Sequence, residues 1–139
     1  MPGIVGMAVA LSFRVKCLEE EAQINNNYEK YKYIVERLQN NVKGFHLTSN
    51  DYCVPNIINF YVDGVIGEAL IASLSNTGVC CSAGSACAAG ESEPSHVLLA
   101  LGLSKENAKN SIRLSFDYDT SWREIEFAMD KIVRDINWL

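Results

Sequence analysis

The segment SIRLSF, residues 111–116, alternates apolar and polar side chains. Its apolar residues share one face of an extended chain: Ile112, Leu114 and Phe116. Its polar residues share the other face: Ser111, Arg113 and Ser115. This pattern predicts a short strand with one buried face and one wet face. The chain therefore needs neighbouring strands to pair with this one and further elements to cover its apolar side.

Other segments supply these neighbouring strands and covering elements. Residues 45–49 and 56–62 predict strands, because NIINFYV is rich in β-branched and aromatic residues. VCCS, residues 79–82, predicts a further short strand. Helical spacing predicts a first helix at residues 3–22 and a second from NNN at 25–27 to near Gly44. Two further helices are predicted, at residues 66–78 and from Pro94 to near Gly102. A last helix is predicted from a capping box at Ser121 and Glu124 to the end.

Helices and short strands thus alternate along the chain. This order predicts an α+β fold with a small, mainly antiparallel sheet covered by helices. With 139 residues, 48% of them hydrophobic, the chain is expected to form one domain over residues 1–139. The helix at 3–22 is expected to be long, with a single apolar stripe.

Charge and cysteine content exclude several classes of function. The net charge of -5 gives no basic surface, so nucleic acid is not expected as a partner. No apolar run reaches membrane-spanning length, and the N-terminal stretch lacks the pattern of a signal peptide. Five cysteines, an odd number, favour reduced thiols in a cytoplasm over a disulfide framework. No cysteine or histidine spacing fits a zinc site, so no metal is expected.

Cys87 stands out because its neighbours are so small. It lies in CSAGSACAAG, where glycine, alanine and serine surround the thiol. Such a loop between a strand and a helix is expected to be mobile and able to approach another surface closely. A thiol there can act as a nucleophile if its pKa is lowered. On these residues alone, an idle or buried cysteine in a connection is the alternative.

The wider pattern resembles a known family. SAGSAC at 82–87, EPSHVL at 93–98 and the strand SIRLSF are similar to the C-terminal part of cysteine desulfurases, which are pyridoxal-phosphate enzymes of the class V aminotransferase group. PGIVGMAVA near the start and the stretch from INFYVDG to the loop are also similar, so the resemblance covers nearly the whole chain. It implies the α+β fold of the C-terminal domain of these enzymes.

The resemblance also implies roles for two residues. Cys87 would be the catalytic cysteine, whose thiolate takes sulfur from L-cysteine as a persulfide and leaves L-alanine. Arg113 would bind the substrate carboxylate, a role that suits a guanidinium fixed on a strand. The same likeness implies a sulfur-acceptor protein as partner, sulfur transfer for iron–sulfur cluster assembly, and a homodimer or contact with a cofactor domain.

The chain departs from the complete enzymes in length. Their large domain carries the cofactor lysine and the other groups that hold pyridoxal phosphate, and none of the seven lysines of this chain has that context. The chain alone is therefore expected neither to bind pyridoxal phosphate stably nor to turn over L-cysteine. Two other functions stay open: a non-enzymatic persulfide carrier, and a structural or dimerisation module in which the thiol has no role.

Overall fold

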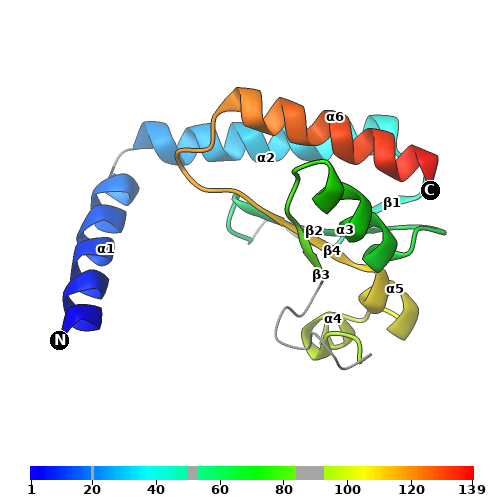
Figure 1. Ribbon diagram of the computed structural model, residues 1–139, viewed down its shortest axis with the longest axis horizontal. Helices are drawn as coiled ribbons and strands as arrows, with labels where there is room; N and C mark the ends of the chain where they lie inside the picture. The colour runs from blue at the N-terminus through cyan, green and yellow to red at the C-terminus, as the bar shows by residue number, and fades with distance from the viewer. Residues whose placement is uncertain (20, 50–52, 84–92) are drawn as a thin grey trace.

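A computed structural model of the chain describes residues 1–19, 21–49, 53–83 and 93–139, without the side chains of residues 17–23. The helices are α1 (Pro2–Glu19), α2 (Glu21–Asn41), α3 (Gly67–Asn76), α4 (His96–Ala100), α5 (Lys105–Asn110) and α6 (Trp122–Trp138). The strands are β1 (Phe45–Leu47), β2 (Ile57–Val62), β3 (Ser82–Ala83) and β4 (Ile112–Ser115). Figure 1 shows α2 and α6 side by side along the sheet.

The four strands form one antiparallel sheet in the order β1-β2-β4-β3. Strands β2 and β4 lie at its centre and pair Ile58 with Leu114 and Phe60 with Ile112. The predicted α+β fold with a small antiparallel sheet is therefore confirmed. Because consecutive side chains on a strand point to opposite faces, this register also decides which residues are buried and which are open.

One face of the sheet carries the core. The central strands contribute Ile58, Phe60, Ile112 and Leu114, each less than 9% exposed. Helices α2, α3 and α6 cover this face with the following buried residues: Ile34, Leu38, Leu70, Leu74, Ile125, Met129, Ile132 and Ile136. The capping box at the start of α6 forms as predicted, with Ser121 and Glu124 bonded reciprocally. Helix α6 packs on the sheet through Ile125, Met129, Ile132 and Ile136.

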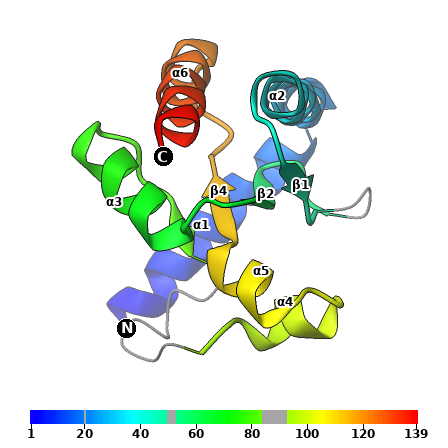
Figure 2. The ribbon, with the colours of Figure 1, turned by 90° about the vertical axis from the view of Figure 1, so that its right-hand side faces the viewer.

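The opposite face of the sheet is only partly covered. Figure 2 shows the short helices α4 and α5 beneath the sheet, on the side away from α2 and α6. Asn59, Tyr61 and Arg113 lie on this face, and all three are half-buried. Polar side chains near the centre of a sheet, with little cover above them, are typical of a binding surface and not of a second core.

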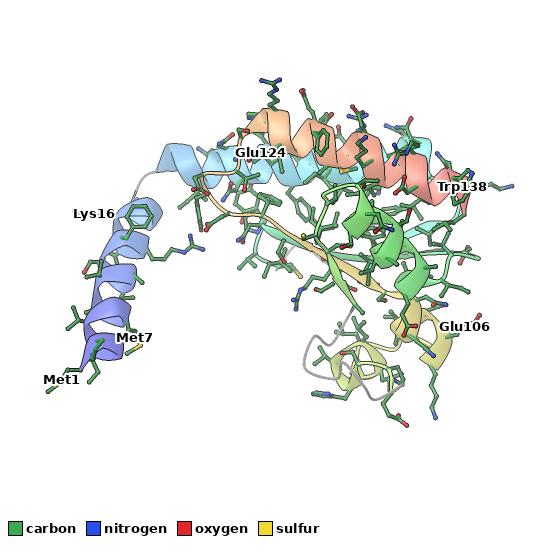
Figure 3. All side chains as sticks on the ribbon, viewed as in Figure 1. Met1, Met7, Lys16, Glu106, Glu124 and Trp138 are labelled. Atoms are coloured by element: carbon green, nitrogen blue, oxygen red, sulfur yellow. The ribbon has the colours of Figure 1, made fainter. Side chains whose placement is uncertain are left out.

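Helix α1 stands away from the rest of the fold, and its side chains project on all sides (Figures 1 and 3). Its large apolar residues are at least 46% exposed: Ile4, Val5, Met7, Val9, Leu11, Phe13 and Val15. Near the end of the helix, Arg14 pairs with Asp117 at 3.2 Å and lies over the Tyr118 ring. The expected single apolar stripe is thus wrong, because α1 is apolar all round. In the described part of the chain, no helix is both long and apolar enough to cross a membrane.

The boundary between the first two helices differs from the prediction. Helix α1 is described to Glu19, residue 20 lies outside the described residues, and α2 runs from Glu21 through the NNN segment, which was predicted to separate the two helices. Asn26 accepts a hydrogen bond from Trp122 Nε1 at 3.0 Å, and Asn27 is fully buried. The asparagines do not cap a helix: Asn26 is bonded to α6, and Asn27 lies in the interior.

Smaller differences concern the second half of the chain. Helix α5 was not predicted; Ser104 caps it by accepting from the Asn107 N–H at 3.1 Å. Ser111, expected on the wet face of its strand, lies before β4 and is fully buried, with its hydroxyl donating to the Asn107 carbonyl at 2.8 Å. The strand predicted at VCCS begins only at its last residue, Ser82.

Candidate functional site

Of the two predicted site residues, the structure describes one. Cys87 lies outside the described residues, so its expected position is not tested. The segment before it enters through β3, where Ser82 pairs with Arg113 and Ala83 with Ile112. The strand that leads to the cysteine therefore lies directly beside the strand that carries the arginine.

Arg113 lies on β4 between two polar neighbours. Asn59 of β2 is its partner on one side, and Ser82 of β3 is its partner on the other. Within the described part of the chain, its guanidinium makes no hydrogen bond and no ion pair. A half-buried arginine without a carboxylate partner has all five N–H donors available for an anion.

Arg113 lines a cavity of about 390 Å³ beneath the sheet. The polar lining consists of Thr48, Ser49, Asn59, Ser95 and Arg113. The apolar lining consists of Val54, Ile57, Val97, Leu98 and Leu101, and Cys53 completes it. Part of the apolar wall comes from α4, which follows the segment that contains Cys87. The cavity combines one fixed cation, several neutral polar groups and an apolar wall, which suits a small anionic molecule.

Asn59 is the polar group that faces Arg113 most directly. Its side-chain carbonyl accepts a hydrogen bond from the Thr48 hydroxyl. Its backbone N–H donates to Ser49 Oγ at 2.8 Å, and its backbone carbonyl accepts from the N–H groups of Thr48 at 2.9 Å and Ser49 at 3.2 Å. The sequence analysis did not single out Asn59. The alternation of NIINFYV places Asn59 on the other face of the strand from Ile58 and Phe60. Only the register of β2 with β4 brings it beside Arg113.

The other described cysteines differ in their surroundings. Cys80 is exposed at the edge of an apolar hollow of about 400 Å³ between α6 and the end of β4. Cys81 is half-buried, and burial together with the neighbouring Cys80 raises the pKa of its thiol from 9.0 to about 11. Since the thiolate is the reactive form, Cys81 is poorly suited to act as a nucleophile at neutral pH.

We expect native Cys81 to react with iodoacetamide at pH 8 about tenfold more slowly than a thiol of pKa 9.0. The raised pKa lowers the thiolate fraction about 100-fold, and the greater nucleophilicity of a more basic thiolate recovers about half of that loss on a logarithmic scale. Peptide mapping by mass spectrometry measures the rate. In urea, where the fold is lost, Cys81 and Cys80 should react at the same rate. Equal reaction rates of these two cysteines in the native protein would contradict the assignment.

The histidines take no part in this cavity. His46 of β1 is exposed, stacks on Tyr61 with ring centroids 4.6 Å apart and bonds Asp63 at 2.9 Å. His96 is exposed at the start of α4. Among the described residues, no group of three or more histidine, cysteine, aspartate or glutamate side chains can hold a metal ion. Arg113 and the neutral donors of the cavity suit recognition of an anion.

Comparison with known proteins decides the family. The model of the family described as Aminotransferase class-V matches residues 1–127. The chain belongs to the class-V aminotransferase family.

Within this family the chain is similar to cysteine desulfurases. It is 38% identical over 140 residues to the cysteine desulfurase IscS of Buchnera aphidicola subsp. Baizongia pistaciae, a match that covers 98% of this chain and 33% of the relative. It is 40% identical over 133 residues to the cysteine desulfurase IscS of Vibrio vulnificus, covering 93% of this chain and 31% of the relative. The chain thus spans about a third of the length of these relatives.

The fold matches solved structures of the same kind. A NifS-like protein superposes with a TM-score of 0.82 at 26% identity, over 99% of this chain and 34% of the other. A NifS-like protein from Rickettsia africae gives a TM-score of 0.62 at 25% identity, over 84% of this chain and 31% of the other. The fold expected from the resemblance is therefore confirmed.

The class-V aminotransferase family implies pyridoxal phosphate in the full-length enzyme. The described residues that line the Arg113 cavity do not fit that cofactor. They include no lysine that could form an imine with it and no acidic side chain that could hold its ring nitrogen. The cavity residues fit a carboxylate instead, because Arg113 supplies a cation and Asn59 a neutral amide.

Proposed function

We propose that residues 1–139 form one domain, the C-terminal domain of a cysteine desulfurase, in which Cys87 accepts sulfur and Arg113 binds the carboxylate of L-cysteine. One observation carries the proposal most: in a chain of this family, Arg113 is unpaired among the described residues and lies beside β3, which leads to Cys87. Cys87 lies four positions after Ala83, a reach of up to about 14 Å when extended.

The proposed reaction is a transfer of one sulfur atom. The Cys87 thiolate attacks the sulfur of L-cysteine, a new S–S bond forms, and the bond between that sulfur and its carbon breaks. The carbon is protonated, so the products are L-alanine and a persulfide on Cys87. No outside oxidant or reductant is needed. Pyridoxal phosphate, held by the rest of the full-length enzyme, supplies the electron sink for this chemistry.

The chain is proposed to be incomplete for turnover. We expect no L-alanine when the purified chain is incubated with L-cysteine and pyridoxal phosphate, and no absorbance change typical of a stably bound imine. The reason is the lack of a lysine in the cavity lining and the chain's coverage of only a third of its relatives. Alanine is measured by amino-acid analysis, with a full-length cysteine desulfurase as positive control. Steady alanine release would contradict the proposal.

The sulfur-accepting role of Cys87 has its own test. The chain is mixed with a full-length cysteine desulfurase and L-cysteine, and each cysteine peptide is examined by mass spectrometry for one added sulfur atom. A carrier function predicts the added sulfur at Cys87 and its loss in Cys87→Ser, whereas a domain that works only with its own cofactor domain predicts none in this mixture. The matched control is Cys80→Ser, because Cys80 is an exposed thiol close to the same loop. Sulfur spread evenly over all cysteines would contradict a specific role.

This experiment also separates the two sulfur-transfer functions. A carrier takes up sulfur from the donor enzyme in this mixture, although the chain alone produces no alanine. A domain that works only with its own cofactor domain takes up none. In either case the proposed location is the cytoplasm, and L-cysteine is the proposed source of sulfur. The proposed partners are a sulfur-acceptor protein of iron–sulfur cluster assembly and either a second copy of the chain or a cofactor domain.

A structural or dimerisation module is the remaining alternative, and one observation favours it. The exposed apolar surface of α1 is large for a soluble monomer and calls for a covering partner. Such a module would keep its full function in Cys87→Ser, whereas both sulfur-transfer functions would lose theirs.

A further inference from the structure

We propose that Asn59 is a second binding residue for the substrate carboxylate, donating from its side-chain Nδ2 beside the guanidinium of Arg113. This inference rests on the proposed function, because it concerns the same substrate in the same cavity. It extends that function to a residue on a different strand.

The orientation of the Asn59 amide is fixed by its neighbours. Its Oδ1 accepts from the Thr48 hydroxyl, which comes from the segment after β1. Within the described part of the chain, its Nδ2 has no hydrogen-bond partner. With Oδ1 held on one side, Nδ2 is the atom left to donate to a ligand in the cavity.

The backbone of Asn59 is held as firmly as its side chain. Its carbonyl accepts from two successive N–H groups, those of Thr48 and Ser49, and its own N–H donates to Ser49 Oγ. Three backbone-linked bonds and one side-chain bond therefore converge on one residue. A binding group on a strand, with its rotamer fixed by supporting hydrogen bonds, loses little conformational freedom when it takes a ligand.

The register places the two donors within reach of one carboxylate. Asn59 and Arg113 are directly opposite each other on β2 and β4. Side chains at such positions have Cβ atoms about 4.5–5.5 Å apart. A carboxylate has about four lone-pair sites, so it can accept a paired contact from the guanidinium and a further bond from an amide.

The test is a titration of the ¹⁵N-labelled 139-residue chain with L-alanine, followed by the side-chain resonances of Asn59 and Arg113. L-Alaninamide, which keeps the amine and methyl group but lacks the carboxylate, is the ligand control. We expect saturable shifts with L-alanine only, their loss in Arg113→Ala, and an affinity about tenfold weaker in Asn59→Ala. Asn59→Asp should bind more weakly still, because its carboxylate repels the ligand and pairs with Arg113.

Two further variants separate binding from structure. Thr48→Val frees the amide to rotate and should weaken L-alanine binding less than Asn59→Ala does. Tyr61→Phe is the matched control, since Tyr61 lies on the same face of β2 outside the cavity, and it should bind normally. Backbone spectra identify any variant that is misfolded.

The outcomes distinguish this inference from the proposed function. Normal L-alanine affinity in a folded Asn59→Ala overturns the role of Asn59 and leaves that of Arg113 in place. Shifts that are equal with L-alaninamide, or no saturable shift at all, also overturn it. In both cases alanine release and sulfur transfer to Cys87, which are measured separately, still test the proposed function.

Discussion

Replacing Lys30 with methionine is expected to raise the free energy of unfolding at pH 7 by about 1–2 kcal/mol. Lys30 lies on α2 and is only 1% exposed, yet its side chain makes no hydrogen bond or ion pair within the described part of the chain. Asn27, one turn earlier on α2, is also buried, and neither polar atom of its amide has a partner among the described residues. With little exposed surface, Lys30 loses part of its hydration and makes no hydrogen bond within the described part of the chain, whereas methionine of similar length has no charge to desolvate.

The same group predicts how stability changes with pH. Burial lowers the pKa of Lys30 below its usual 10.5, and the negative charges of Asp119 and Glu124 oppose part of this shift. Between the lowered pKa and 10.5 the unfolded chain binds more protons than the folded one, so stability rises with pH in that window. Below the lowered pKa the cost of the buried charge is present in full. Urea unfolding at pH 7 and at pH 10 should therefore show that the advantage of Lys30→Met shrinks as the pH rises.

Lys32→Met is the matched control. Lys32 lies two residues further along α2, its side chain is 63% exposed, and it pairs only with exposed Glu29 at 3.5 Å. A pair of this kind contributes little, so the control should change stability by less than about 0.5 kcal/mol. A Lys30→Met protein that is less stable than the unchanged chain, or one whose advantage is independent of pH, would contradict an unpaired buried charge.

The central strands could be predicted from the sequence because alternation reflects burial directly. Ile58, Phe60, Ile112 and Leu114 occupy alternate positions, and all four are buried. The capping box of α6 was predictable for a similar reason, since both of its hydrogen bonds are made within four residues. Local signals of this kind need no knowledge of the partner element.

The first 41 residues show where such signals fail. Asparagine favours helix ends, so NNN predicted a break, but Asn26 and Asn27 face α6 or the interior and lie within α2. The helical spacing in residues 3–22 predicted an apolar stripe, although apolar residues occupy every side of α1. Tertiary contacts decided the first case. In the case of α1, the residues at helical spacing form one stripe, but the residues between them are apolar as well.

The candidate site was predictable only in part. Arg113 was named from its resemblance to a family motif and from its place on the polar side of a strand. Asn59 was not named, because nothing in NIINFYV indicates which residue of another strand it will face. A shift of one residue in the register of β2 with β4 would have turned it into the core. The strand pairing is therefore what converts two separate polar residues into one candidate binding surface.

Replacing Ile4 and Val9 with glutamate is expected to abolish self-association of the chain. These residues are 66% and 64% exposed on α1, and no charged side chain lies between Pro2 and Phe13. An apolar helix with this exposure gains by pairing with another copy, since each buried side chain of this size contributes about 1.5–3 kcal/mol. Losing two such contacts and burying two charges should weaken association at least about 100-fold.

Sedimentation velocity over a range of protein concentrations measures this effect. The average mass of the unchanged chain should rise with concentration, whereas that of the double variant should stay at the value of one chain. Trp138→Glu is the matched control, because Trp138 is 82% exposed at the far end of α6 and belongs to no comparable surface, so it should associate normally. An unchanged chain that stays monomeric throughout would mean that the apolar surface of α1 is not sufficient for pairing. Association that survives the double substitution would place the contact on another surface.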